Sequence, residues 1–255
     1  MQKISSYILT FNSEKYLEII LSKIDKISDE IIILDSGSND NTKNIVEKFH
    51  KAIFQYRKFD NYIEQRNYAA SLCSNDTIFF VDSDEIPDDE LIENIQKLKE
   101  EGIPEDTAYS IDRIWYALNK KVHCLYPVIS PDCPARIFNR KYASFGIKSN
   151  LVHESLYGYL KNMKIKGSLN HYTFNSREEL FSKIDNYTNL AARDLINNKK
   201  HVGLINIYFN PFVIFIKWYF FNRGFIDGRV GFILSCYAYK YTKEKYIKAY
   251  TLKNI

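Results

Sequence analysis

The sequence predicts an α/β fold with a mostly parallel central sheet and a helical C-terminal segment. In the first hundred residues, short runs that are apolar throughout alternate with segments whose apolar residues recur at helical spacing. Strands that are apolar throughout are typical of parallel sheets covered by helices on both faces. From about residue 199 the chain becomes basic and aromatic, which indicates a separate segment.

Four strands and four helices are expected in the first half of the chain. The predicted strands are 4–11, 30–35, 52–57 and 77–82, and the predicted helices are 12–24, 41–50, 62–73 and 87–102. Asn12 or Ser13 should cap the first helix. In the fourth helix, Pro87 is expected near the first turn and Gly102 beyond the end. After about Thr107 the alternation stops, and two further strands, 108–118 and 120–128, are expected to be antiparallel.

The composition is that of an ordinary folded protein. Hydrophobic residues make up 45% of the 255 residues and charged residues 26%. The four cysteines form no CxxC pair, which argues against a zinc site or a disulfide framework and favours a reducing compartment. The first residues begin a strand pattern at once, without a charged leader and a long apolar core, so we expect no signal peptide and a cytoplasmic location.

The C-terminal segment 199–255 carries most of the positive charge. It holds ten Lys or Arg and two acidic residues, a net charge of +8, whereas the whole chain has +4. Apolar residues nearly fill 204–221, but Pro211 and Lys217 interrupt them. Because a spanning helix needs roughly 20 mostly apolar residues, this stretch is better suited to lying in a membrane interface. The alternative is a helix buried against the core.

Polar residues follow three of the predicted strands, at the edge where ligands bind in parallel sheets. They are Thr10, Phe11 and Asn12, then Asp35, Ser36, Gly37 and Ser38, then Asp82, Ser83, Asp84 and Glu85. Asp35 could accept a hydrogen bond from a ribose or a base edge, or it could simply form an Asx turn and cap a helix. Neither a GxGxxG turn nor a GxxxxGK[ST] loop is present.

The pair Asp82 and Asp84 is the strongest local signal. Carboxylates two residues apart at a strand end can converge on one divalent cation, and Mg²⁺ typically takes one or two protein carboxylates together with substrate phosphates. The alternative is that the acidic residues complement the positive end of the following helix. That explains Asp88 and Asp89 but leaves Asp82 unexplained, since it ends an apolar strand. Glu85 could belong to either group. A phosphatase pair usually lies on the first strand of the chain, so we do not favour it.

Five more residues have useful chemistry and also a simpler structural explanation. Arg66 could clamp a diphosphate or be a surface charge. If the ligand is a sugar nucleotide, inverting transfer needs a carboxylate base, for which we expect Glu154 near a possible helix start, with Asp132 as the second candidate. An ordinary helix-cap acid is the alternative for Glu154. His171 could donate to the diphosphate, ligate the metal or serve only in structure. Arg136 could bind an anionic group, orient the base or form a surface ion pair.

The motifs together resemble a known enzyme family. "ILTFNSEKYLEIILSKI", "DEIIILDSGSNDNT", "EQRNYAA" and "IFFVDSDE" resemble the N-terminal half of family 2 glycosyltransferases with a GT-A fold. "PARIFNR", "LVHE", "NHYTFNS" and "FFNRGFIDGRVGF" are similar to the lipopolysaccharide-core glucosyltransferase branch, whose members add a hexose to inner-core heptose. The resemblance covers about residues 3 to 245. Asn41 replaces a glycine that is usual in the family, and Ser83 replaces the commoner alanine.

This resemblance implies roles for the strand-end residues. Those expected to contact the nucleotide sugar are Thr10, Asn12, Asp35, Ser36, Arg66, Asp82, Ser83 and Arg136. Asp84 would bind Mg²⁺ or Mn²⁺ directly, and Asp82 would contact the nucleotide sugar, the metal or a metal-bound water. His171 is a further candidate ligand of the metal. Glu154 stands where the catalytic acidic residue of the family falls.

The expected activity is inverting, metal-dependent transfer of a hexose, with glucose as the first candidate, from a UDP-sugar. The acceptor would be a lipid-linked saccharide such as the lipopolysaccharide inner core, at the inner face of the membrane. We expect a glycosyltransferase domain in 1–198, with a nucleotide-sugar half in 1–105 and an acceptor half in 106–198, and a membrane-proximal segment in 199–255. Capsule, teichoic-type polymer or protein could replace the acceptor. A nucleotidyltransferase and a non-catalytic membrane module are the alternatives of another class, and no nucleic-acid partner is expected.

Overall fold

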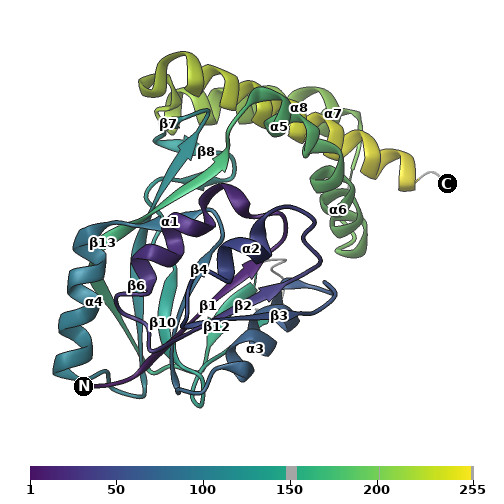
Figure 1. The fold of residues 1–255 in the computed structure, drawn as a ribbon. Coiled ribbons are helices and arrows are strands. Elements are labelled where there is room, and N and C mark those ends of the chain that lie inside the picture. The colour runs from purple at the N-terminus through teal and green to yellow at the C-terminus, as the bar shows by residue number, and fades with distance from the viewer. Residues whose placement is uncertain (148–153, 201, 254–255) are drawn as a thin grey trace. The chain divides into compact units, whose positions relative to one another are not determined.

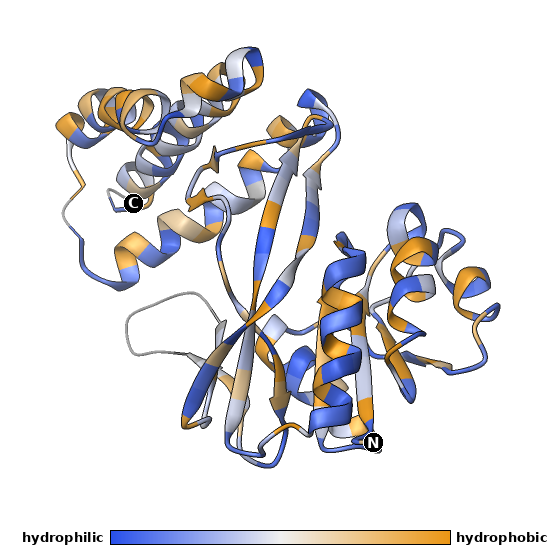
Figure 2. Ribbon diagram, turned by 90° about the vertical axis from the view of Figure 1, so that its left-hand side faces the viewer, coloured by the Kyte–Doolittle hydropathy of each residue, from blue (hydrophilic) through white to orange (hydrophobic). Residues whose placement is uncertain are grey.

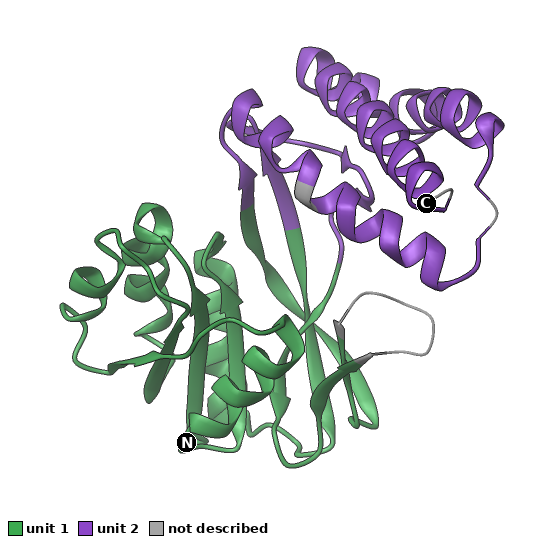
Figure 3. Cartoon of the chain, turned by 90° about the vertical axis from the view of Figure 1, so that its right-hand side faces the viewer, with its two compact units in different colours: residues 1–113, 133–171 green, residues 114–132, 172–255 purple. Residues whose placement is uncertain are grey.

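The computed structural model describes residues 1–147, 154–200 and 202–253, without the side chains of Ile147, Glu154 and Asn186. Figure 1 shows the elements along the chain, and Figure 3 colours separately the two compact units into which the chain divides. Unit 1 comprises Met1–Arg113 and Cys133–His171, and unit 2 comprises Ile114–Asp132 and Tyr172–Ile255. The predicted division at residue 199 is a division by function and stays a prediction.

Unit 1 begins with a four-stranded parallel sheet in the order β3-β2-β1-β4. The strands are β1 (Ile4–Thr10), β2 (Glu30–Asp35), β3 (Ala52–Tyr56) and β4 (Thr77–Asp82). The helices that connect or follow them are α1 (Glu14–Ile24), α2 (Thr42–Val46), α3 (Tyr62–Leu72) and α4 (Asp89–Glu101). The predicted alternation of strands and helices is therefore confirmed.

Helices cover both faces of this sheet because the strand side chains are apolar on both. On one face, Ile8, Ile33 and Val81 pack in a cluster with residues of α1, α2 and α4. On the other face, Tyr7 and Phe80 pack with α3 and with the hairpin of β11 (Ser144–Ile147) and β12 (Glu154–Tyr157). The two clusters fix the sheet between them, so the carboxyl ends of its strands are held in place.

The remaining strands extend the sheet in an antiparallel manner. Next to β4 lies β10 (Ala135–Asn139), antiparallel to it, followed by β6 (Thr107–Ala117), β13 (Lys161–Phe174) and the short β5 (Glu85–Pro87). Strand β7 (Lys120–Lys121) pairs with β6. The antiparallel pairing expected after residue 107 is confirmed, and the α/β fold class with it.

Four local predictions were wrong. The helix expected over 41–50 is only the five residues of α2, and the strand expected over 120–128 breaks into β7, β8 (Cys124–Leu125) and β9 (Val128–Ile129). Pro87 ends β5, and α4 starts two residues later with Asp88 as its cap, whose carboxylate accepts from Leu91 N at 2.8 Å. Glu154 begins strand β12 instead of lying at a helix start.

Unit 2 is mostly helical. Its helices are α5 (Arg177–Ser182), α6 (Ile184–Asn197), α7 (Leu204–Ile216), a π-helical stretch (Lys217–Phe221), a 3-10 turn (Gly224–Asp227) and the long α8 (Gly228–Lys253). Figure 2 shows many apolar residues along the helices near the C-terminal end. The stretch Leu204–Phe221 is long and apolar enough to cross a membrane by length and composition alone, and only 17% of it is buried. The prediction of a helix buried against the core therefore does not describe α7.

At Gly167, strand β13 packs closely against the start of α4. The φ of Gly167 is +99°, and a Cβ added there would clash with the backbone N and Cα of Leu91. Gly102, the C-cap of α4, has a similar φ of +94° but open space around it. We expect Gly102→Ala to lower the free energy of unfolding by about 1–3 kcal/mol through backbone strain. Gly167→Ala should cost about 1–3 kcal/mol more, because overpacking is added.

Urea unfolding of the two variants would measure these costs. Equal losses would show that the approach of β13 to α4 does not constrain Gly167.

Candidate active site

The register of the parallel sheet brings the predicted strand ends together. Thr10 lies opposite Asp35 across β1 and β2, and Leu9 lies opposite Asp82 across β1 and β4. The carboxyl ends of three strands therefore meet at one edge of the sheet, where ligands bind in this class of fold.

The loop after β2 is organised around Asp35, which is only 2% exposed. One oxygen of its carboxylate accepts from the backbone N–H groups of Gly37 and Ser38 at 2.8 Å, and the other accepts from the Thr10 hydroxyl at 2.8 Å. Asp35 thus forms the Asx-type turn that was one of its two predicted roles. Its contact with a nucleotide stays a prediction.

The loops after β1 and β2 are tied to each other. Asn12, at φ +50°, donates its backbone N–H to the Ser38 hydroxyl at 2.8 Å and accepts from Asn39 N at 3.0 Å. The backbone N–H of Ser36 donates to the Thr10 carbonyl at 3.0 Å. These bonds hold the two loops together at the polar edge of the sheet. Ser83, the remaining predicted strand-end residue, lies half-buried in the turn after β4.

Asp82 is held between two arginines from different elements. Arg66 of α3 donates Nη2–H to its Oδ1 at 2.8 Å, and Arg136 of β10 donates Nη2–H to its Oδ2 at 3.1 Å. Both arginines are buried. Burial alone would raise the pKa of Asp82, but the two guanidinium groups hold that pKa well below its usual range. Asp82 is therefore an anion with both oxygens engaged.

Glu85 is the most deeply buried acid of the cluster, with none of its surface exposed. Its Oε1 lies 2.5 Å from Arg136 Nη2 and 3.2 Å from Arg113 Nη1, and its Oε2 accepts from Asp82 N at 3.3 Å. Burial opposes ionisation, yet Arg136 outweighs it and the pKa of Glu85 is lowered. Glu85 belongs to β5, so of its two predicted alternatives the one as a charge of the helix cap does not describe it, whereas a place beside the metal site stays a prediction.

An aromatic shelf supports the arginines. The guanidinium carbon of Arg136 lies 4.5 Å from the ring centre of Phe80, and that of Arg66 lies 5.0 Å from Phe80 and 5.4 Å from Phe145. Phe80 in turn stacks on Tyr7, with ring centres 5.4 Å apart. Flat guanidinium groups pack well on aromatic faces, which fixes the direction of their N–H bonds.

Asp84 is the most exposed acid of the cluster and lies beside His171. Its Oδ1 lies 3.5 Å from Nδ1 of His171, and 39% of its side chain is exposed. Burial, together with the neighbouring charges of Asp82 and Glu85, raises the pKa of Asp84 to about 6, although His171 opposes the rise. An additional cation beside Asp84 would relieve this repulsion.

His171 lies opposite Glu85 in the pairing of β13 and β5, and its Nδ1 is 3.4 Å from Glu85 Oε1. Burial would lower the pKa of His171, but Asp84 and Glu85 outweigh burial and raise it. The position of His171 beside two carboxylates is compatible with both predicted roles, donor to the diphosphate and metal ligand, and both stay predictions.

The donor set fits a divalent cation that is shared with a ligand. Within 1–147, 154–200 and 202–253, no three His, Cys, Asp or Glu side chains are grouped so as to hold a metal by themselves. Mg²⁺ does not need such a cage, because it usually keeps one or two carboxylates and completes its shell with phosphate oxygens and water. Asp84 is the suitable carboxylate, since the oxygens of Asp82 are engaged by arginines.

A pocket of about 610 Å³ opens beside Asp82. Arg66, Arg113 and Arg136 line it together with Phe80, Phe145 and residues of β6, β10 and β12. Its volume is in the range of pockets that hold small-molecule ligands. The combination of fixed cations and aromatic walls is suited to an anionic ligand with a ring.

The two predicted bases cannot be placed against this cluster. Asp132 lies in unit 2, where its Oδ1 accepts from Trp115 Nε1 at 2.7 Å. The side chain of Glu154 lies outside the part of the chain that the structure describes. Sequence reasoning missed Arg113, although a charged residue inside the otherwise apolar pattern of β6 was a signal for it.

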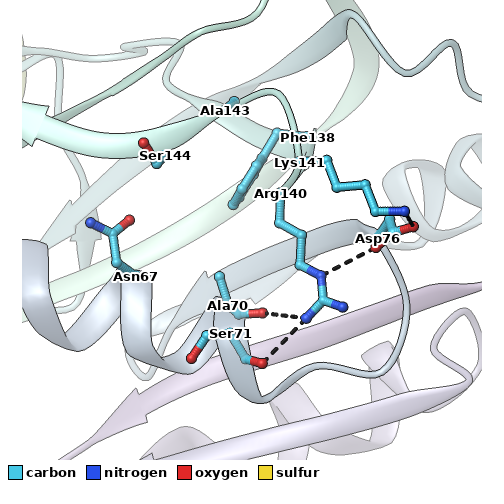
Figure 4. Close-up of a pocket in the computed structure, with 9 residues that line it drawn as sticks. All are labelled: Asn67, Ala70, Ser71, Asp76, Phe138, Arg140, Lys141, Ala143 and Ser144. Carbon is cyan, nitrogen blue, oxygen red and sulfur yellow. Dashed lines mark hydrogen bonds and ion pairs between the residues drawn. The ribbon is translucent and has the colours of Figure 1, made fainter.

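A second hollow, of about 370 Å³, lies near the start of β4 and is shown in Figure 4. Arg140 lines it and donates to the carbonyls of Ala70 at 3.1 Å, Ser71 at 3.3 Å and Cys73, while Asp76 pairs with it at 3.3 Å. These carbonyls end α3, so Arg140 serves as a helix C-cap. It has a structural role here.

Comparison with known proteins identifies the family. The model of "Glycosyl transferase family 2" matches residues 5–147, more than half of the chain. The chain belongs to glycosyltransferase family 2. This glycosyltransferase is 28% identical over 92% of its length to an uncharacterized glycosyltransferase of Rickettsia conorii, covering 85% of that protein. It is 26% identical over 90% of its length to the lipopolysaccharide core biosynthesis glycosyltransferase LpsC of Rhizobium meliloti, covering 85% of that protein.

Solved structures give weaker likenesses. S. aureus TarS is 16% identical, with a TM-score of 0.44, over 90% of this chain and 44% of that chain. Glucosyl-3-phosphoglycerate synthase of Mycobacterium tuberculosis, solved with Mn²⁺ and UDP-glucose, is 22% identical, with a TM-score of 0.37, over 45% of this chain and 44% of that chain. Such scores transfer neither substrate nor metal to this glycosyltransferase. Its GT-A fold follows from its family and its own sheet order.

Replacing Arg136 should destabilise the protein strongly, because Arg136→Met leaves Glu85 and Asp82 with less compensation in a buried site. Breaking a buried ion pair costs about 3–5 kcal/mol, whereas the exposed pair of Arg57 and Asp60 is worth at most about 1 kcal/mol. Chemical unfolding of Arg136→Met and of the control Arg57→Met would measure the difference. Adding Glu85→Gln to Arg136→Met should recover part of the loss. Equal costs for the two arginines would contradict the arginine-held cluster.

Proposed function

We propose that this enzyme transfers a hexose, with glucose as the first candidate, from a UDP-sugar with inversion and with help from Mg²⁺ or Mn²⁺. The observation that carries the proposal is the cluster at the end of β4. There Asp82 and Glu85 are neutralised by arginines, whereas Asp84 has no arginine partner among the described residues, is partly exposed and has a pKa raised to about 6. A cation bound by Asp84 would neutralise the departing diphosphate, which is the chemistry that a divalent metal supplies.

The chain's own residues would position the donor. The loops of Thr10, Asn12, Asp35 and Ser36 form the rigid edge on which the nucleoside would lie. His171, whose Nδ1 lies 3.5 Å from Asp84 Oδ1 and 3.4 Å from Glu85 Oε1, would donate a hydrogen bond to the diphosphate. Arg66 and Arg136 would act on the donor mainly by orienting Asp82, since both already donate to that carboxylate.

The sugar would enter the pocket of about 610 Å³ beside Asp82, where the acceptor must also arrive. Inversion requires a carboxylate that takes the proton of the acceptor hydroxyl while that oxygen attacks the anomeric carbon. We assign this role to Glu154, on β12, whose neighbours Ser155 and Leu156 line the pocket. Asp132 is the second candidate.

The acceptor proposed is a lipid-linked saccharide such as the lipopolysaccharide inner core. The similarity to LpsC, which is a lipopolysaccharide core enzyme by name, supports this class of acceptor. The apolar side chains exposed on α7, among them Ile205, Phe209 and Phe212, support contact with the cytoplasmic face of the membrane through 199–255. Family membership removes the support for a nucleotidyltransferase or a non-catalytic module.

Donor binding should depend on the metal. In calorimetric titrations with UDP-glucose, UDP-galactose and GDP-mannose, we expect the UDP-sugars to bind in the presence of Mn²⁺. Affinity should fall by about tenfold or more, at least about 1.4 kcal/mol, when EDTA removes the metal, because the diphosphate then meets the carboxylate of Asp84 without a bridging cation. Equal affinity for UDP-glucose with and without Mn²⁺ would contradict the metal-assisted mechanism.

Glu154→Gln should separate chemistry from binding. Removing a general base lowers the rate by about 10²–10⁴-fold, while an isosteric amide should leave the affinity for the UDP-sugar unchanged. Transfer would be followed with a soluble saccharide acceptor, and Asp132→Asn serves as the matched control. If Asp132→Asn loses transfer and Glu154→Gln keeps it, the role of base passes to Asp132.

A further inference from the structure

A small pocket in unit 2 is lined by hydrogen-bond donors. It has a volume of about 120 Å³ and lies among α7, α8 and the turn between β8 and β9. Its polar lining residues are Tyr126, Asn210, Thr242, Lys245 and Tyr246. Each of these side chains can donate a hydrogen bond, and no acidic residue lines the pocket. Such a lining is complementary to a small anion.

Thr242 contributes a buried hydroxyl that is not fully satisfied. The residue is 2% exposed, and its Oγ1 makes no hydrogen bond of good geometry within the described ranges. Burial raises the pKa of Tyr126, and a weak side-chain interaction with Thr242 opposes that rise; both residues line the pocket. An unsatisfied buried hydroxyl costs about 1–3 kcal/mol, which a bound acceptor would recover.

Lys245 contributes a half-buried positive charge. Its Nζ lies 4.9 Å from the ring centre of Tyr246 and 5.9 Å from that of Tyr241, and burial lowers its pKa. Its contacts in the described part of the chain are these rings, with no carboxylate at ion-pair distance. A partly desolvated ammonium without a counter-ion is unfavourable, and a bound anion would compensate it.

We propose that this pocket binds the phosphate group of a membrane lipid. A phosphate supplies several acceptor oxygens for the Thr242, Asn210 and tyrosine donors and a negative charge for Lys245. The volume of about 120 Å³ is too small for a nucleotide, because ligand pockets for such molecules are roughly 300 Å³ or larger. The site is therefore distinct from the donor pocket of unit 1.

The surroundings of the pocket favour a lipid as the source of the phosphate. Val213, which lines the pocket, is 43% exposed, and its neighbours on α7, Phe209 and Phe212, are 61% and 57% exposed. Apolar side chains beside a phosphate site match a surface where acyl chains lie next to headgroups. The lipid source rests on the membrane contact proposed above, whereas the phosphate chemistry does not.

Thr242→Val is the decisive variant, because it keeps the shape and the charge of the side chain and removes only the hydroxyl. Thr251→Val, an exposed threonine on the same helix, is its control. Binding of the full chain would be measured on phosphatidylcholine vesicles containing phosphatidic acid and on vesicles with oleate at matched surface charge. Lys245→Met is a second test variant, and Lys243→Met, which removes the same charge outside the pocket, is its control.

The wild type should bind the phosphatidic acid vesicles more tightly than the oleate vesicles. Thr242→Val should weaken binding to phosphatidic acid about three- to tenfold, as expected for the loss of one hydrogen bond, and leave oleate binding unchanged. Its thermal stability should be equal to or above that of the wild type, because a buried hydroxyl that is not fully satisfied is removed. Lys245→Met should lose more affinity than Lys243→Met.

If Thr242→Val behaves like Thr251→Val with every probe, the phosphate site is refuted. Calorimetry with inorganic phosphate distinguishes free phosphate from a lipid phosphate. If the wild type binds inorganic phosphate, Thr242→Val does not, and the wild type shows no preference for phosphatidic acid vesicles, the pocket is a phosphate site but the lipid is overturned as its ligand. If the wild type binds neither kind of vesicle, the proposed membrane contact fails. Transfer to a soluble acceptor still tests the glycosyltransferase mechanism separately.

Discussion

The compensation of two carboxylates, Asp82 and Glu85, by three arginines at the end of β4 is the interaction on which the proposed donor site depends. Glu85 is fully buried and Asp82 is mostly buried, and without partners their charges would repel each other and resist desolvation. Arg136 bridges the two, Arg66 secures one side and Arg113 the other. Because the arginines come from α3, β6 and β10, the cluster also links the parallel and antiparallel parts of the sheet.

This arrangement assigns different tasks to acids that are neighbours in the sequence. Asp82 and Glu85 are structural anions whose oxygens are engaged. Asp84 is partly exposed beside His171, and its pKa is raised mainly by burial, with a contribution from the charges of Asp82 and Glu85. Because arginines engage Asp82 and Glu85, Asp84 is the carboxylate that we propose to share a divalent cation with the diphosphate of a donor.

The sequence allowed much of this site to be predicted, because the strand ends follow from the apolar runs. Strand periodicity located Thr10, Asp35 and Asp82, and the parallel register then brought them together. It could not reveal the partners of Asp82, since Arg66 and Arg136 lie 16 and 54 residues away and meet it only through tertiary packing. Glu85 was ambiguous for the same reason: its pairing with β13 depends on a strand nearly ninety residues later.

Local signals also failed where tertiary context decided the structure. Pro87 suggested a helix start, but it is the last residue of β5, which pairs with β13. In α7 the apolar run was recognised, yet only the structure showed that its side chains stay exposed, which separates a surface helix from a core helix.

The binding of Mn²⁺ in the presence of UDP, followed by electron paramagnetic resonance, tests most directly whether Asp84 is the carboxylate that binds the metal. Asp84→Asn should weaken Mn²⁺ binding by about tenfold or more, since loss of groups that merely support a ligand already costs about 10–100-fold. Asp89→Asn, which changes an exposed acid at the start of α4, should bind like the wild type. Wild-type affinity for Mn²⁺ in Asp84→Asn would contradict the account.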